Sequence, residues 1–128
     1  MIVMKRILLV LILCLLSNNL LAIDRWEYIT SSNDKITSIY INKIIKENEF
    51  ATVWTLLDFS KADKYGNLSI LILMKFDCKW YRVKNLKYSF HKKPMGRGPI
   101  KTSAPKKVEW HYIETYQVNE KIFDRVCN

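Results

Sequence analysis

The sequence is poor in the residues that metal centres and many catalytic sites need. It contains two histidines and three cysteines in 128 residues. His91 and His111 do not form a spaced motif such as His-x-x-x-His, and zinc would need two further ligands. No Gly-x-Ser-x-Gly segment is present, and Asp58 and Asp63 are interpreted as turn residues rather than as a general acid and base. We therefore expect no metal, no cofactor and no enzymatic activity.

Long hydrophobic runs are also lacking. The longest apolar run, Ile7 to Leu16, follows Lys5 and Arg6 and is too short to cross a bilayer as a helix. Leu20-Leu21-Ala22 offers a small residue at a cleavage point. A charged start, a short apolar centre and a small terminal residue are typical of a secretory signal peptide.

We accordingly expect residues 1–22 to be a signal peptide and residues 23–128 to be one exported domain, in the periplasm or at the outer-membrane surface. An uncleaved anchor is the alternative. A lipid-modified Cys14 is a further alternative, although the large Leu13 next to it argues against that processing.

Acidic residues are scarce relative to basic ones. The chain has 12 Asp and Glu against 21 Lys and Arg, a formal charge of +9 that becomes +7 when Lys5 and Arg6 are removed. Such a balance favours acidic partners. Because an exported protein does not meet nucleic acid in the cytoplasm, we expect proteins or acidic polysaccharides at the cell surface, and contact with a membrane only through association with the outer membrane.

The apolar residues of Leu68 to Trp80 follow a strict period of two, which predicts a long central strand with Cys78 on its inner face. Val118, Ile122, Phe123, Val126 and Cys127 recur at helical spacing, so the C-terminus should form an amphipathic helix. Both cysteines would lie in an oxidising compartment, where pairing is the default. We predict a Cys78–Cys127 disulfide that fastens the helix to the sheet.

The remaining chain reads as short strands with turns between them. We expect one helical turn at Lys43 to Glu49, a bulge near Lys84 or Asn85, a loop from His91 to Lys107, and Trp54 and Trp110 in or near the core. The other strands are expected at 24–30, 36–41, 50–59, 80–90 and 108–113. The predicted fold class is α+β, an antiparallel β-sheet of about six strands with one C-terminal helix packed on one face.

Several short segments resemble the surface-adhesin protein E-like family of Gram-negative bacteria, over essentially the whole exported part. These segments are Trp26, Tyr40-Ile41-Asn42, Val53-Trp54-Thr55-Leu56-Leu57-Asp58, Asp77-Cys78, Tyr81-Arg82-Val83, Pro94-Met95-Gly96-Arg97-Gly98, Glu109-Trp110 and Val126-Cys127. The resemblance implies a sheet whose C-terminal helix is tethered by a disulfide. It also implies a cell-envelope protein that binds macromolecules, because some relatives bind host extracellular-matrix or serum proteins.

The strongest functional feature in the residues themselves is a concentration of positive charge in the last third of the chain. Its members are Lys84, Lys87, Lys92, Lys93, Arg97, Lys101, Lys106 and Lys107. We predict a non-catalytic, adhesin-like binding protein of the cell envelope that uses these residues, as a basic loop, to contact host extracellular-matrix or serum proteins or acidic polymers. The alternatives are a periplasmic accessory or structural protein, and a heme carrier that uses His91 beside Tyr88 and Phe90; without such a role, His91 would be a solvated loop residue.

Overall fold

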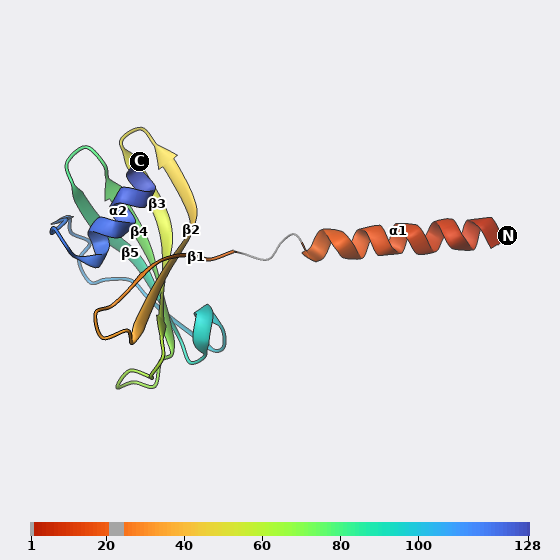
Figure 1. Ribbon diagram of the computed structural model, residues 1–128, viewed down its shortest axis with the longest axis horizontal. Coiled ribbons are helices and arrows are strands. Elements are labelled where there is room, and N and C mark those ends of the chain that lie inside the picture. The colour runs from red at the N-terminus through yellow and green to blue at the C-terminus, as the bar shows by residue number, and fades with distance from the viewer. Residues whose placement is uncertain (1, 21–24) are drawn as a thin grey trace.

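The computed structural model describes residues 2–20 and 25–128, with the backbone alone described for residues 13–20. Figure 1 shows a curved sheet with α2 across one face and α1 outside this body. The elements are α1 (Ile2–Leu20), β1 (Glu27–Ser31), β2 (Thr37–Glu47), β3 (Phe50–Phe59), β4 (Ser69–Asp77), β5 (Arg82–His91), the 3₁₀ turn η1 (Pro94–Gly96), β6 (Ile100–Ser103), β7 (His111–Tyr112) and α2 (Val118–Cys127).

The sheet is antiparallel and follows the chain order β1-β2-β3-β4-β5-β6. β6 pairs with the C-terminal half of β5, whereas the short β7 pairs with Arg82 and Val83 at the start of β5. Short hairpin connections suffice for such an order, because each strand lies beside the one before it. The α+β architecture predicted from the sequence is confirmed.

The core lies between α2 and the sheet. Ile122, Phe123 and Val126 of α2 are buried against inward-facing residues of the strands. Phe76 of β4 lies edge-on to Phe123, with 6.2 Å between ring centroids. The strand residues in this core are Ile39, Ile41, Ala51, Val53, Met74, Phe76 and Val83. Since Met74 and Phe76 face α2, Leu73 and Lys75 face the other side of the sheet.

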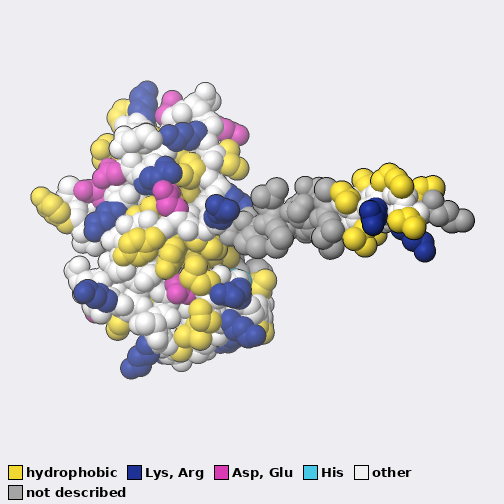
Figure 2. All heavy atoms as spheres, turned by 45° about the vertical axis from the view of Figure 1, so that its right-hand side comes forward, with side chains coloured by type: hydrophobic (Ala, Val, Ile, Leu, Met, Phe, Trp, Pro, Cys, Tyr) yellow, Lys and Arg dark blue, Asp and Glu magenta, His cyan; other side chains and the backbone are white. Residues whose placement is uncertain are grey.

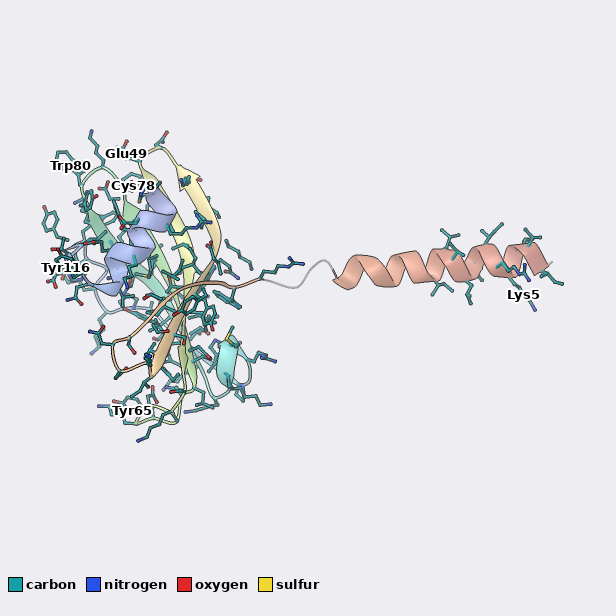
Figure 3. The ribbon with its side chains drawn as sticks, in the orientation of Figure 1. Lys5, Glu49, Tyr65, Cys78, Trp80 and Tyr116 are labelled. Atoms are coloured by element: carbon teal, nitrogen blue, oxygen red, sulfur yellow. A yellow bond between two sulfur atoms is a disulfide. The ribbon has the colours of Figure 1, made fainter. Side chains whose placement is uncertain are left out.

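Cys78 and Cys127 form the predicted disulfide, with their Cα atoms 5.6 Å apart. Cys78 lies one residue beyond the end of β4, in the turn to β5, and Cys127 is the last residue of α2. The bond therefore joins the end of the helix to one end of the sheet, as the labelled Cys78 in Figure 3 shows.

Three local expectations are wrong. The segment Lys43 to Glu49 forms no helical turn, because β2 continues to Glu47 through an irregularity between Asn42 and Ile45. The segment His91 to Lys107 is not wholly a loop, since it contains η1 and β6. Trp54 and Trp110 are only half-buried and lie outside the core beneath α2. Trp54 pairs with Leu73 and so faces away from the helix.

The predicted bulge in β5 is present, displaced by one residue. Leu73 pairs with Lys87 but Met74 pairs with Asn85, so Leu86 is the extra residue. An extra residue reverses the alternation of side chains along a strand. Lys84 and Lys87, three residues apart, therefore project from the same face.

At the N-terminus, the part of the chain that the structure describes contains no helix both long and apolar enough to span a membrane. The expected cleavage point after Ala22 and the side chain of Cys14 lie outside the described residues. The signal peptide remains a prediction.

Candidate functional site

The sheet face opposite α2 carries a cluster of cations and aromatic rings at the end nearest the disulfide. We call it the cation–aromatic surface. It consists of Phe50, Lys75, Arg82, Lys84, Lys87 and Trp110. The strands β3, β4 and β5 supply five of these residues, and Trp110 comes from the segment just before β7.

The pairing of β4 with β5 places Lys75 directly opposite Lys84. Like charges at directly opposed positions destabilise a sheet. Here each ammonium group lies near an aromatic ring, since Lys75 Nζ is 4.8 Å from the centroid of Phe50 and Lys84 Nζ is 4.5 Å from that of Trp110. The two rings stack with 6.0 Å between centroids. Cation–π attraction therefore offsets part of the repulsion and holds both ammonium groups close to the sheet.

Arg82 extends this surface toward the β4–β5 turn. Its Cζ lies 4.6 Å from the centroid of Trp110, and its Nε donates to Asp77 Oδ2 at 2.8 Å. Asp77 is buried, which alone would raise its pKa. The hydrogen bonds from Arg82 and from the backbone N–H groups of Trp80 and Lys79 outweigh burial, so the pKa of Asp77 lies below its usual value.

Asp77 thus neutralises Arg82, whereas Lys75, Lys84 and Lys87 have no ion pair within the described chain. The cation–aromatic surface keeps three uncompensated positive charges on a rigid part of the sheet. Such an arrangement is suited to an anionic polymer or to an acidic patch on a protein.

The eight basic residues predicted from the sequence do not share one surface. Lys84 and Lys87 belong to the cation–aromatic surface. Lys93 and Arg97 flank η1, and Lys92 and Lys101 line a pocket between β5, β6 and the β3–β4 loop. Lys106 and Lys107 precede β7, and Lys107 forms an ion pair with Glu109 at 2.7 Å. On the face visible in Figure 2, basic side chains are spread over the domain rather than gathered at one place.

The η1 segment is held against the sheet by three hydrogen bonds. Ser69 Oγ donates to the carbonyl of Lys93 at 2.6 Å and accepts from the backbone N–H of Gly96 at 2.9 Å. The N–H of Met95 donates to Asp58 Oδ1 at 2.7 Å. Lys93 and Arg97 therefore project from a segment with a defined position.

His91 is not the solvated residue that its loop-like sequence context suggests. Its exposed fraction is 2 %, and its Nε2 lies 2.7 Å from Ser89 Oγ. Its Nδ1 is buried and has no hydrogen-bond partner in the described part of the chain. Burial lowers the pKa of His91. A histidine enclosed in this way is poorly placed to reach a heme iron from the surface.

Sequence reasoning missed Phe50, Lys75, Arg82 and Trp110 as members of a site. The alternation in β4 did place Lys75 on the face away from the core. Lys75 lies next to Lys84 only because β4 pairs with β5. Trp110 reaches the same place because β7, which follows it directly, pairs with the start of β5. A search for cations on the outer face of both strands of a hairpin would have found the lysine pair.

Comparison with known proteins gives a consistent result. A family model described as Surface-adhesin protein E matches residues 26–128. The structure of crystal form II of Haemophilus influenzae protein E is similar at 17 % identity with a TM-score of 0.62, covering 80 % of this chain and 88 % of that chain. The crystal structure of protein E from non-typeable Haemophilus influenzae is 17 % identical with a TM-score of 0.60, covering 83 % and 78 %. No match is found among curated proteins.

Proposed function

This chain belongs to the surface-adhesin protein E family, and on that premise we propose that it is a non-catalytic binding protein of the cell envelope that contacts acidic polymers or acidic patches of extracellular proteins. Family membership supports an adhesin-like surface protein. The partner class is our proposal, and so is the location at the outer surface of an envelope rather than in the periplasm.

The observation that carries this proposal is the opposed pair Lys75 and Lys84 on the cation–aromatic surface. Folding alone would favour opposite charges at these positions. Two ammonium groups held together on a rigid sheet suit a ligand that presents closely spaced anionic groups. Lys87 lies on the same face and lengthens the row. Lys93, Arg97, Lys106 and Lys107 are proposed to add weaker, more distant contacts, while Lys92 and Lys101 face the pocket.

The test compares three variants that each lose three positive charges. The sheet variant replaces Lys75, Lys84 and Lys87 by Gln. The loop variant replaces Lys93, Arg97 and Lys106 by Gln, and the control replaces the exposed Lys35, Lys46 and Lys61 by Gln. The measurement is the salt concentration that elutes each protein from a heparin column.

We expect the sheet variant to elute earliest and the loop variant to elute between it and the control. Surface contacts contribute about 0 to 1 kcal/mol each, so losing three should cost at most about 3 kcal/mol and weaken binding by up to about 100-fold. Binding of the unaltered protein should weaken with added salt, because screening acts beyond about 8 Å at physiological ionic strength. Equal losses in all three variants would leave net charge as the cause and would refute a defined surface.

A further inference from the structure

We infer that the pocket between β5, β6 and the β3–β4 loop is a binding site for a small amphipathic carboxylate, above all an aryl carboxylate. This inference is independent of the polymer surface proposed above, because the two sites share no residue. The pocket has a volume of about 610 Å³, within the range of small-molecule sites. It lies at the end of the domain marked by Tyr65 in Figure 3, opposite the end marked by Cys78.

The walls of the pocket are apolar. Phe90 supplies a ring that stacks on Tyr88 with 6.2 Å between centroids, so it is supported from the side. Ile100 and Pro99 come from the start of β6 and the turn before it, and Tyr65 comes from the β3–β4 loop. Ile100 and Tyr65 are exposed by 64 % and 70 %, large fractions for side chains of this size. A planar apolar body placed here would cover side chains that now face water.

Two ammonium groups stand beside this apolar wall. Lys101 lies opposite Phe90 in the β5–β6 pairing, and its side chain has no ion pair or hydrogen bond within the described chain. Lys92 also lines the pocket, and its Nζ donates to the carbonyl of Tyr65 at 2.6 Å. An ammonium has three donors, so Lys92 keeps two for a ligand. An apolar wall with two cations matches a ligand that has an apolar body and one carboxylate.

The β3–β4 loop, which carries Tyr65, is ordered by hydrogen bonds to the carboxylate of Asp63 in the same loop. Asp63 Oδ1 accepts from the backbone N–H groups of Tyr65 and Asn67, both at 2.9 Å, and Oδ2 accepts from the Asn67 amide at 3.2 Å. The hydrogen bond from the Asn67 backbone, together with weaker contributions that include the charge of Lys92, lowers the pKa of Asp63 despite some burial. This carboxylate is therefore committed to the loop and holds the Tyr65 side of the pocket in place without a ligand.

The experiment uses the exported protein and 2-naphthoate as the probe, followed by amide chemical shifts in NMR titrations. We expect saturable binding with shifts concentrated at Phe90, Ile100 and Lys101. The neutral comparator 2-naphthol should bind about tenfold more weakly, because it lacks charge-assisted hydrogen bonds. Absence of saturable binding at millimolar probe, or shifts concentrated away from the pocket, would overturn the inference.

The variants separate the pocket from net charge. Replacing Lys92 and Lys101 by Gln should weaken 2-naphthoate about tenfold and bring it level with 2-naphthol. The matched control replaces the exposed Lys35 and Lys61 by Gln, both outside the pocket lining, and should bind like the unaltered protein. Equal weakening in both double variants would refute the assignment. Heparin retention of the sheet variant tests the polymer surface separately, so either proposal can fail alone.

Discussion

Asp77 and His91 are ionisable residues that the sheet withdraws from water, and they lie at opposite ends of the β4–β5 hairpin. Asp77 is 1 % exposed and lies opposite Arg82 in the β4–β5 register. His91 is 2 % exposed and lies opposite Ser69 in the same register. A buried charged group needs partners, and a buried neutral histidine resists protonation. Both residues therefore contribute to the pH dependence of the stability of this domain.

Replacing Asp77 by Asn should destabilise the domain by about 1 to 3 kcal/mol at pH 7, because Arg82 and two backbone N–H groups lose a charged acceptor. The pKa of Asp77 is lower in the folded state than its ordinary 3.8, so its stabilising effect is complete above that value and is lost as pH falls toward the folded pKa. Urea unfolding at pH 7 and pH 3 should show a smaller difference between variant and unaltered protein at pH 3. A difference that does not shrink would contradict this role.

His91 should make the free energy of unfolding fall as pH falls below about 6.5. Its folded pKa is lowered by burial, so the unfolded chain takes up a proton near the ordinary 6.5 and the folded chain does so only at lower pH. Urea unfolding between pH 7.5 and 5 measures this slope. The His91→Gln variant should lose part of it, and the control variant His111→Gln, altered at an exposed residue, should keep it. Identical slopes in both variants would rule out His91 as the source.

The helix α2 has only 10 residues and depends on the rest of the fold for its stability. A helix this short is marginal in water on its own. Its buried residues Ile122, Phe123 and Val126 supply apolar contact, and Cys127 supplies the covalent link. Tyr81 adds a ring 4.3 Å from that of Phe123. The helix is thus held by packing along its length and by a bond at its last residue.

Replacing Cys78 and Cys127 together by Ser should lower the free energy of unfolding by about 4 kcal/mol, because the bond closes a separation of 49 residues in the unfolded chain. Urea unfolding compares the variant with the oxidised protein, and reduction of the unaltered protein with a thiol serves as the second route to the same state. Intact mass after alkylation should show no free thiol at these residues before reduction. An unchanged unfolding midpoint, or two free thiols before reduction, would contradict the stabilising role of the disulfide.

At the scale of the whole molecule, the chain combines a formal charge of +9 with positive side chains that are spread over the face visible in Figure 2. Such a surface attracts acidic partners over a distance that depends on the salt concentration. The structure divides this charge between the cation–aromatic surface, the η1 segment and the pocket. The division explains why we propose two kinds of ligand rather than one.

Export of the protein through a cleaved signal peptide is a prediction about the whole molecule that the fold does not test. We expect the secreted protein to begin at Ile23 and to lack Cys14, because Ile7 to Leu16 has the length of a signal-peptide core. Intact mass of protein from the cell envelope measures the cleavage point, and protease treatment of intact cells shows whether the domain faces outward. A mass that retains residues 1–22 would support the uncleaved anchor. A mass that begins at a lipid-modified Cys14 would support a lipoprotein.

The residues alone determined the elements with a strong period. The alternation in β4 and the helical spacing of α2 are visible in the sequence because one face of each element is apolar. Cys78 and Cys127 fall on these faces and are the two cysteines of the expected exported domain, so only one disulfide was possible there. The phase slip in β5 was also visible, since a bulge interrupts the alternation that a strand otherwise keeps.

Tertiary structure alone decided the site. The continuation of β2 past Lys43 and the pairing of β6 with β5 come from hydrogen bonds between strands, which local composition does not encode. Nearness in sequence suggested one basic site from Lys84 to Lys107, but strand register separates Lys101 from Lys84 and brings Lys75 beside Lys84. Strand pairing brings together residues from distant segments of the chain. The cation–aromatic surface and the pocket therefore exist only once the sheet has formed.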